Sequence, residues 1–149
     1  MGDLAPLTET EVRQLADDWY RLLDVHDPMV NLLPMLPSDG ITQKWPEVTV
    51  TDLVGFEEWY QRVIRTFFDE EHTLKEFNVT LNGDGSKADV KVIVYWEASV
   101  WTPGDRLSKR LMMDAYQTWE VIRSAQSGKP VIKTIIVDKI DEKPGSASL

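Results

Sequence analysis

His72 is the residue of this sequence best suited to proton transfer, because imidazole is the side chain that ordinarily gains and loses a proton near neutral pH. Asp69, Glu70 and Glu71 come directly before it, at the expected end of a helix. Carboxylates in that position oppose the helix dipole, and such a local conflict can mark a functional site. We therefore take His72 as a candidate general base or acid.

Two other interpretations of Asp69–His72 stay open. The helix could end at Phe68, which would leave all four side chains in solvent. A metal site could also use this run, but adjacent residues on a turn rarely converge on one ion, and the sequence offers no second cluster to complete the shell. The sequence therefore predicts no metal.

Gln117 is a second candidate, because an amide in an otherwise apolar row needs hydrogen-bond partners once it is buried. Alternation along the predicted strand puts its side chain on the same face as those of Leu111, Met113, Ala115 and Trp119. A ligand, a neighbouring side chain or a water could each be the partner. We take Gln117 as an orienting donor for a ligand or substrate.

The remaining polar candidates have competing structural roles. Asp114 lies on the opposite face from Gln117 by alternation, unless a bulge between the two reverses one of them. His26 follows the first predicted helix, where a histidine is favourable for the helix dipole alone. We expect His26 to be structural.

Tryptophan is unusually frequent, with six residues in 149 that are spread over nearly every predicted element. A large aromatic core and an aromatic-lined cavity both explain this distribution, because small-ligand pockets are mostly apolar with few polar groups. If a cavity exists, the expected ligand-binding residues are Trp19, Trp45, Tyr60, Trp96 and Trp119.

Two segments with helical periodicity would position these residues. In the first, Thr8 can cap a helix with Glu11 as its capping-box partner, and an apolar stripe runs from Val12 to Leu23. Asp27-Pro28 is expected to end that helix. Asp52 can cap the second, whose apolar residues recur every three or four positions over residues 55–68. Gly40–Trp45 is expected to form a short strand.

After His72 the apolar residues recur at every second position, which predicts strands. Strand-like runs cover residues 77–81, 90–96, 107–121 and 131–140, and the turn signals Asn82–Gly85, Pro103–Asp105 and Gln126–Pro130 separate them. Helices followed by an antiparallel meander predict an α+β domain with a strongly curved sheet whose concave face is covered by the helices. Residues 1–143 would form this single domain, and 144–149 would be a disordered tail.

The central strands are apolar on both faces, which bears on assembly. Ile93, Tyr95, Met112 and Tyr116 lie on the face that the helices do not cover. A strand that is apolar on both faces is normally covered on both. A second copy of the chain is the simplest cover, so we expect a homodimer.

Composition narrows the function further. A net charge of −9 disfavours binding to nucleic acid or to an anionic membrane. The absence of cysteine excludes thiolate catalysis and fits a cytoplasmic location. Met1–Leu7 shows no signal peptide, and no apolar run is long enough to span a membrane. No phosphate-binding loop, dinucleotide fingerprint or nucleophile motif is present, so no cofactor is expected.

This order of elements resembles the NTF2-like superfamily, which includes SnoaL-like cyclases, ketosteroid isomerases and scytalone dehydratase. The resemblance covers residues 8–140 and rests on Leu22–Asp27, on the helix Gly55–Phe68 and on the closing pattern from Trp119 to Ile132. The runs Phe67–His72 and Asp114–Trp119 look like uncharacterised bacterial members. The resemblance implies a cone with a pocket between the concave face and the helices, and dimerisation through the convex face.

The chemistry of the named families transfers poorly. The positions that match the catalytic residues of ketosteroid isomerases are Trp19, Lys44 or Trp45, and Gln117, and none has the required chemistry. A histidine–aspartate arrangement of the SnoaL-like kind would have to come from His72 and Asp114. We therefore expect a domain that binds a small, partly aromatic or apolar molecule. A cofactor-free lyase, cyclase or isomerase that uses His72, and a non-catalytic dimeric interaction module, are the alternatives.

Overall fold

The computed structural model describes residues 4–149, and six of its strands form one curved sheet in the order β2-β1-β6-β5-β4-β3. The long strands β3 (Phe68–Leu81), β4 (Lys87–Val100), β5 (Lys109–Arg123) and β6 (Pro130–Glu142) form an antiparallel meander. The short strand β1 (Thr42–Lys44) pairs parallel with β6, and β2 (Thr49–Val50) pairs antiparallel with β1. The expected α+β class and antiparallel meander are confirmed.

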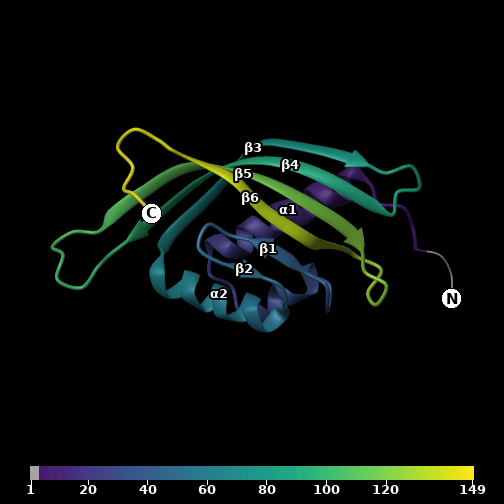
Figure 1. Ribbon diagram of the computed structural model, residues 1–149, viewed down its shortest axis with the longest axis horizontal. Helices are drawn as coiled ribbons and strands as arrows, with labels where there is room; N and C mark the ends of the chain where they lie inside the picture. Colours follow the sequence, from purple (N-terminus) through teal and green to yellow (C-terminus); the bar gives the residue numbers. More distant parts are fainter. Residues whose placement is uncertain (1–3) are drawn as a thin grey trace.

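Two α-helices lie on the concave side of this sheet (Figure 1). Helix α1 (Glu9–Asp24) begins at the predicted capping box, in which the Thr8 hydroxyl accepts a hydrogen bond from the Glu11 backbone N at 3.2 Å. Helix α2 (Leu53–Thr66) begins at the predicted cap Asp52, whose carboxylate accepts a hydrogen bond from Gly55 N at 2.7 Å. Between the helices, the chain makes two 3-10 turns, at Met29–Asn31 and Leu33–Met35.

The main hydrophobic core joins one face of α1 to the concave face of the sheet, and Trp19, Phe56 and Trp119 are among its fully buried members. Along β5 the alternate residues from Leu111 to Val121 are all buried, which confirms the expected inward face. Helix α2 stands away from the long strands of the sheet (Figure 1). A cavity lies between them.

The sequence places the change from helix to strand about four residues too late. Helix α2 ends at Thr66 and β3 already begins at Phe68, so Asp69, Glu70 and Glu71 are strand residues. The expectation that these carboxylates oppose a helix dipole is therefore wrong. Asp69 has a positive φ of 50° at a β-bulge, and the inward positions that follow it are polar, which hides the strand periodicity in the sequence.

The structure describes the C-terminal end of the chain but not its first three residues. Residues 1–3, which include the start of the Met1–Leu7 segment and of the expected 1–143 domain, lie outside the described residues. Residues 144–149, for which the sequence predicts disorder, run back along β5 in the structure: Ser146 Oγ accepts from Met112 N at 2.8 Å, and Ala147 N donates to Arg110 O at 2.8 Å. No described helix is long and apolar enough to cross a membrane.

Candidate functional site

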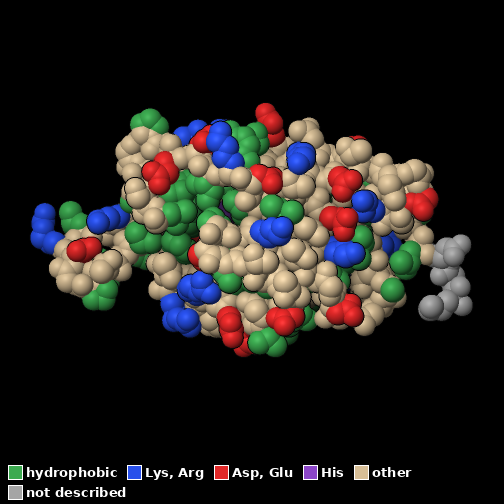
Figure 2. Space-filling view, in the orientation of Figure 1, with side chains coloured by type: hydrophobic (Ala, Val, Ile, Leu, Met, Phe, Trp, Pro, Cys, Tyr) green, Lys and Arg blue, Asp and Glu red, His purple; other side chains and the backbone are tan. Residues whose placement is uncertain are grey.

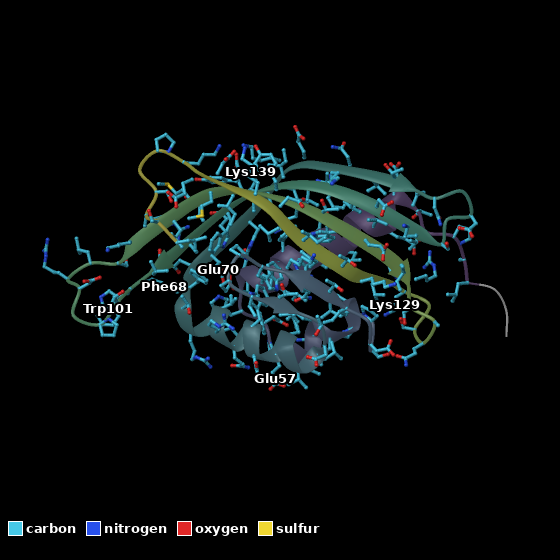
Figure 3. The ribbon with its side chains drawn as sticks, in the orientation of Figure 1. Glu57, Phe68, Glu70, Trp101, Lys129 and Lys139 are labelled. Atoms are coloured by element: carbon cyan, nitrogen blue, oxygen red, sulfur yellow. The ribbon has the colours of Figure 1, made fainter. Side chains whose placement is uncertain are left out.

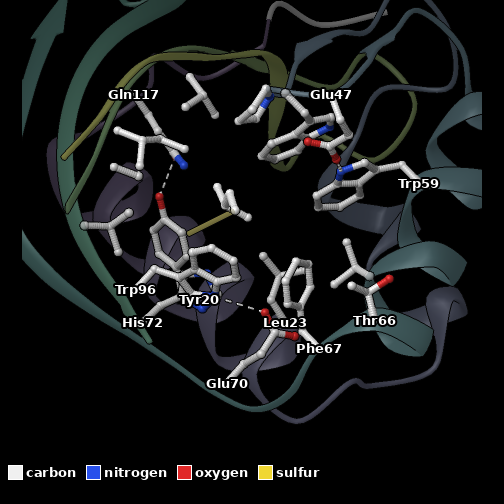
Figure 4. A pocket seen from close by; sticks show the side chains of 18 of the residues that line it. Tyr20, Leu23, Glu47, Trp59, Thr66, Phe67, Glu70, His72, Trp96 and Gln117 are labelled. Atoms are coloured by element: carbon white, nitrogen blue, oxygen red, sulfur yellow. Dashed lines mark hydrogen bonds between the residues drawn. The ribbon is translucent and has the colours of Figure 1, made fainter. Parts of the chain in front are cut away.

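A cavity of about 450 Å³ lies between the concave face of the sheet and the two helices. This volume is within the range that suits a small organic ligand. Its walls are mostly apolar, and Figure 2 shows hydrophobic side chains gathered where the sheet overhangs α2. The polar side chains on its wall include His72, Glu70, Tyr20 and Gln117. Figure 4 shows these groups, together with Trp96, on one side of the cavity and Trp59 and Glu47 on the other.

His72 is paired with Asp24, the last residue of α1. The distance from His72 Nδ1 to Asp24 Oδ1 is 2.5 Å, and His72 backbone N donates to Asp24 Oδ2 at 3.2 Å. The two side chains are only 11% and 24% exposed. A carboxylate beside Nδ1 selects the tautomer with the proton on Nδ1, and it leaves the lone pair of Nε2 free. In the neutral imidazole this arrangement leaves Nε2 able to accept a proton, and Asp24 fixes the orientation of the ring.

The imidazole of His72 lies close to two aromatic rings. The Tyr20 ring is stacked on it at 5.0 Å between centroids, and the Trp96 ring is stacked at 6.3 Å. Packing against these rings restricts rotation of the imidazole, so the direction of Nε2 is held by packing as well as by Asp24.

Glu70 forms a second histidine–carboxylate pair on the same wall. Its Oε2 contacts His26 Nε2, and its Oε1 accepts a hydrogen bond from Trp96 Nε1 at 3.1 Å (Figure 4). The Glu70 side chain is 3% exposed and that of His26 is 22% exposed. His26 has a positive φ of 52° just after α1, which turns its ring back toward the sheet.

Gln117 is held by two buried donors. Its Oε1 accepts hydrogen bonds from the Tyr20 hydroxyl at 2.7 Å and from Trp119 Nε1 at 2.9 Å. Because an indole N–H can only donate, this contact fixes which end of the amide is oxygen. The amide nitrogen accordingly faces the other way, toward the cavity that Gln117 lines (Figure 4). Burial raises the pKa of the Tyr20 hydroxyl far above its ordinary value, so Tyr20 stays a neutral donor.

The opposite wall is aromatic. The rings of Trp45 and Trp59 stack at 4.0 Å between centroids with an angle of 7° between their planes. Trp59 Nε1 donates to Glu47 Oε1 at 3.1 Å, and Arg62 also lines this side. A flat aromatic wall favours a flat apolar ligand.

The structure brings most of the predicted site residues together, but not all. Trp19, Trp45, Trp96, His72 and Gln117 line the cavity. Tyr60 and Trp119 do not.

Tyr60 and Trp119 are instead packed in the core, each with a hydrogen bond inside the protein. The Tyr60 hydroxyl donates to Asp27 O at 2.6 Å, and Trp119 is fully buried behind Gln117. Burial, together with the negative charges of Asp27 and Glu70, raises the pKa of Tyr60 to about 12.

Asp114 does not pair with His72. It lies on the convex face, where its Oδ2 contacts Lys75 Nζ at 2.7 Å and Lys143 Nζ at 2.5 Å. Asp114 therefore does not supply a SnoaL-like histidine–aspartate arrangement with His72, because alternation along β5 turns its carboxylate away from the cavity, as the sequence predicts in the absence of a bulge.

Sequence reasoning missed Asp24 as the partner of His72 and assigned His26 a purely structural role. These contacts join α1 and the residues after it to β3, 44 and 48 residues further on. No local spacing encodes such contacts. One signal in the sequence could have suggested these contacts. The titratable residues Asp24 and His26 lie at the end of an amphipathic helix, and the strand that begins near residue 68 carries further titratable residues.

Comparison with solved structures identifies the fold. A structure provisionally assigned as a scytalone dehydratase, from Novosphingobium aromaticivorans DSM 12444, matches with a TM-score of 0.71 and 12% identity, over 94% of this chain and 88% of that one. A provisionally assigned dehydratase from the NTF2-like family, from Streptomyces avermitilis, matches with a TM-score of 0.70 and 13% identity, over 85% of this chain and 92% of that one. The chain has the NTF2-like fold.

A third similar structure with this NTF2-like arrangement is hexachlorocyclohexane dehydrochlorinase LinA-type3 from Novosphingobium barchaimii LL02. Its TM-score is 0.72 and its identity 13%, over 94% of this chain and 92% of that one. Identities this low establish the fold alone. No family model matches the sequence, and no curated protein matches it.

Proposed function

We propose that the protein binds a small, mostly apolar or aromatic molecule in its NTF2-like cavity and removes a carbon-bound proton from it, as the first event of a cofactor-free elimination. The observation that carries this proposal is the His72–Asp24 pair on the wall of an apolar cavity of about 450 Å³. The names of three similar structures agree with it, because two are dehydratases by provisional assignment and one is a dehydrochlorinase. Both reactions are eliminations.

His72 Nε2 accepts the proton in this mechanism. Asp24 holds the proton on Nδ1 and stabilises the imidazolium that forms, because opposite charges at 2.5 Å attract strongly in a partly dehydrated site. Tyr20 and Trp96 restrict the imidazole plane, and the mostly apolar walls of the cavity offer few groups that would compete for Nε2.

Gln117 supplies the complementary donor. Removal of a carbon-bound proton by a neutral imidazole requires that the negative charge be delocalised, for example onto a carbonyl oxygen next to that carbon. The Gln117 amide nitrogen faces the cavity and is oriented by Tyr20 and Trp119, so it can donate to that oxygen as charge develops. The substrate class is therefore a small aromatic or apolar carbonyl compound with a leaving group.

The base is tested with nitrobenzisoxazole, a flat bicyclic probe. Removal of its carbon-bound proton breaks the nitrogen–oxygen bond, and the ring opens to a coloured cyanophenolate. We expect His72→Gln to lower the opening rate by about 10²–10⁴-fold, the usual contribution of a general base. Asp24→Asn should lower it at least about tenfold, because the tautomer of His72 is no longer fixed. Asp18→Asn, which alters an exposed ion pair on the same helix, is the matched control.

Equal rates for the wild type and His72→Gln would contradict the elimination proposal. Titration of tryptophan fluorescence with nitrobenzisoxazole then distinguishes the two alternatives. Saturable quenching without turnover would indicate a protein that binds a ligand but does not convert it. The absence of quenching would indicate a non-catalytic interaction module.

We also propose that a second copy of the chain covers the convex face, in a cytoplasmic homodimer. In the single chain Ile93, Tyr95, Met112 and Tyr116 are only partly buried on this face. Sedimentation equilibrium at micromolar concentration should give twice the chain mass of 17.1 kDa. A monomeric mass would remove the dimer from the proposal without touching the cavity chemistry.

A further inference from the structure

The Glu70–His26 pair has no part in the proton abstraction described above, although Glu70 lines the same cavity. A buried carboxylate is costly unless its partners compensate for the lost water. Glu70 has two: Trp96 Nε1 on one oxygen, and His26 Nε2 on the other. Neither partner carries a fixed positive charge. The carboxylate is therefore held in a form that can share a proton with its histidine, rather than being fixed as an ion by lysine or arginine.

The pair also provides a path for a proton between solvent and cavity. Glu70, which is 3% exposed, faces the cavity, whereas His26, 22% exposed and absent from the cavity wall, lies on the solvent side of it. A proton taken up by His26 can pass to Glu70 Oε2 along the contact between them. Glu70 is then a carboxylic acid on the cavity wall.

Glu70 and His72 are placed to act on one molecule. They are two residues apart on β3, so their side chains lie on the same face, and their Cα atoms are roughly 7 Å apart along the strand. Trp96 joins them, since its ring stacks on His72 and its N–H holds Glu70. An acid and a base at this spacing can reach neighbouring carbons of one substrate.

Building on the proposed elimination, we propose that Glu70, recharged through His26, protonates a departing oxygen, and that the substrate class is a small β-hydroxy carbonyl compound. His72 Nε2 takes the proton from the carbon next to the carbonyl, the carbon–carbon double bond forms, and the carbon–oxygen bond breaks. The oxygen leaves with the Glu70 proton as water. His72 then returns its proton to solvent and His26 takes one up, so the reaction is a dehydration with no net proton change.

The need for Glu70 follows from the leaving group. Hydroxide is a poor leaving group and departs from a carbon only when a proton reaches it, whereas a phenolate or chloride departs unaided. A cavity that offers only a base suits a leaving group, such as phenolate or chloride, that departs without a proton. The presence of the Glu70–His26 pair on the same wall as His72 therefore favours dehydration.

Two probes separate the acid from the base. A β-hydroxy-β-phenyl ketone, whose dehydration gives an absorbing enone, requires both groups, and nitrobenzisoxazole requires only the base. We expect Glu70→Gln to lower the dehydration rate about 10²-fold more than the nitrobenzisoxazole rate, measured on the same sample. Because the result is a ratio, partial loss of folded protein affects both rates equally. Glu71→Gln, an exposed neighbour on β3, is the matched control and should leave the ratio unchanged.

His26→Gln and Trp96→Phe extend the test. His26→Gln removes the path for recharging and should lower the same ratio, though by less, because solvent can reprotonate Glu70 slowly. Trp96→Phe keeps a ring on His72 but removes the N–H that positions Glu70, so the ratio should fall by about tenfold. Trp96 is thus a positioning residue.

An equal fall of both rates in Glu70→Gln would overturn the assignment and make Glu70 structural. So would a wild type that opens nitrobenzisoxazole but does not dehydrate the hydroxy ketone. Failure of the proposed function looks different, because in that case His72→Gln changes neither rate.

Discussion

The two faces of the sheet each bury a carboxylate, and the two carboxylates have different partners. Glu70 on the concave face and Asp114 on the convex face are both 3% exposed at the side chain. Glu70 is held by a histidine and an indole, whereas Asp114 is held by Lys75 and Lys143. Figure 3 shows the two sides, with Glu70 beneath the sheet and Lys139 above it.

This difference in partners agrees with the chemical role proposed for Glu70 and with a structural role for Asp114. Burial by itself would raise the pKa of the Asp114 carboxyl, but the hydrogen bonds and charges of Lys143 and Lys75 outweigh that effect and hold the pKa below its ordinary value. Asp114 therefore stays an anion throughout the physiological range and cannot exchange protons there. Glu70 has no lysine or arginine partner among the described residues, only His26 and Trp96.

A polar group whose partners are buried should contribute more to stability than one whose partners reach solvent. Gln117 and Asp114 allow this comparison within one strand, since they lie three residues apart on opposite faces of β5. The Tyr20 and Trp119 donors that bind Gln117 are 4% and 0% exposed as residues, whereas the lysine side chains that bind Asp114 are 45% and 38% exposed.

The largest effect is expected for Gln117→Leu, which leaves the Tyr20 hydroxyl and Trp119 N–H buried without an acceptor. The free energy of unfolding should fall by about 2–4 kcal/mol, at roughly 1–3 kcal/mol for each unpaired donor less the gain from burying leucine. A urea titration followed by tryptophan fluorescence measures this change. Thr118→Val, on the opposite face at the next position, is the control and should change stability by less than about 1 kcal/mol.

A Gln117→Leu protein as stable as the wild type would show that the amide serves a ligand alone. In that case the concave and convex faces would not differ in the way proposed here.

The fold was more accessible to sequence reasoning than the site. Periodicity, the Thr8 and Asp52 caps and the turn at Asn82–Gly85 are local signals, and they predict the two helices, the meander and the inward face of β5 that carries Gln117. The start of β3 was misplaced because its inward positions, Glu70 and His72, are polar, and polar residues at buried positions interrupt the alternation that identifies a strand.

The site depends on contacts between distant parts of the chain. His72 could be selected from its chemistry alone, but its partner Asp24 could not, because α1 reaches β3 only through packing. The alternative partner, Asp114, is equally plausible by residue type and is excluded only by the face on which it lies. Trp119 lies on the same inward face of β5 as Gln117, which is why a place on the cavity wall was expected for it. In the structure Gln117 covers its ring, and Trp119 does not line the cavity.

The smallest effect is expected for Asp114→Asn, and it should depend on pH. Near pH 7 the variant should be less stable by about 1.5–2 kcal/mol, the lower part of the range for hydrogen bonds to charged groups. Two observations place it there: the lysines can turn to water, and among the described residues nothing donates a hydrogen bond to Asp114 Oδ1. The rate of nitrobenzisoxazole opening should stay within about twofold of the wild type, because the convex face takes no part in proton abstraction.

The sign of the pH dependence follows from the lowered pKa of Asp114. The carboxylate binds fewer protons in the folded protein than in the unfolded chain, so its contribution is complete above the ordinary aspartate pKa of about 3.9 and is lost as the pH falls through the lower folded value. The wild type and Asp114→Asn should therefore converge in stability below about pH 4, whereas Asp138→Asn, on the exposed side of β6, should follow the wild type at every pH. A difference that persists undiminished in acid would mean that Asp114 stabilises through its shape, not its charge, and the contrast with Glu70 would lose its electrostatic basis.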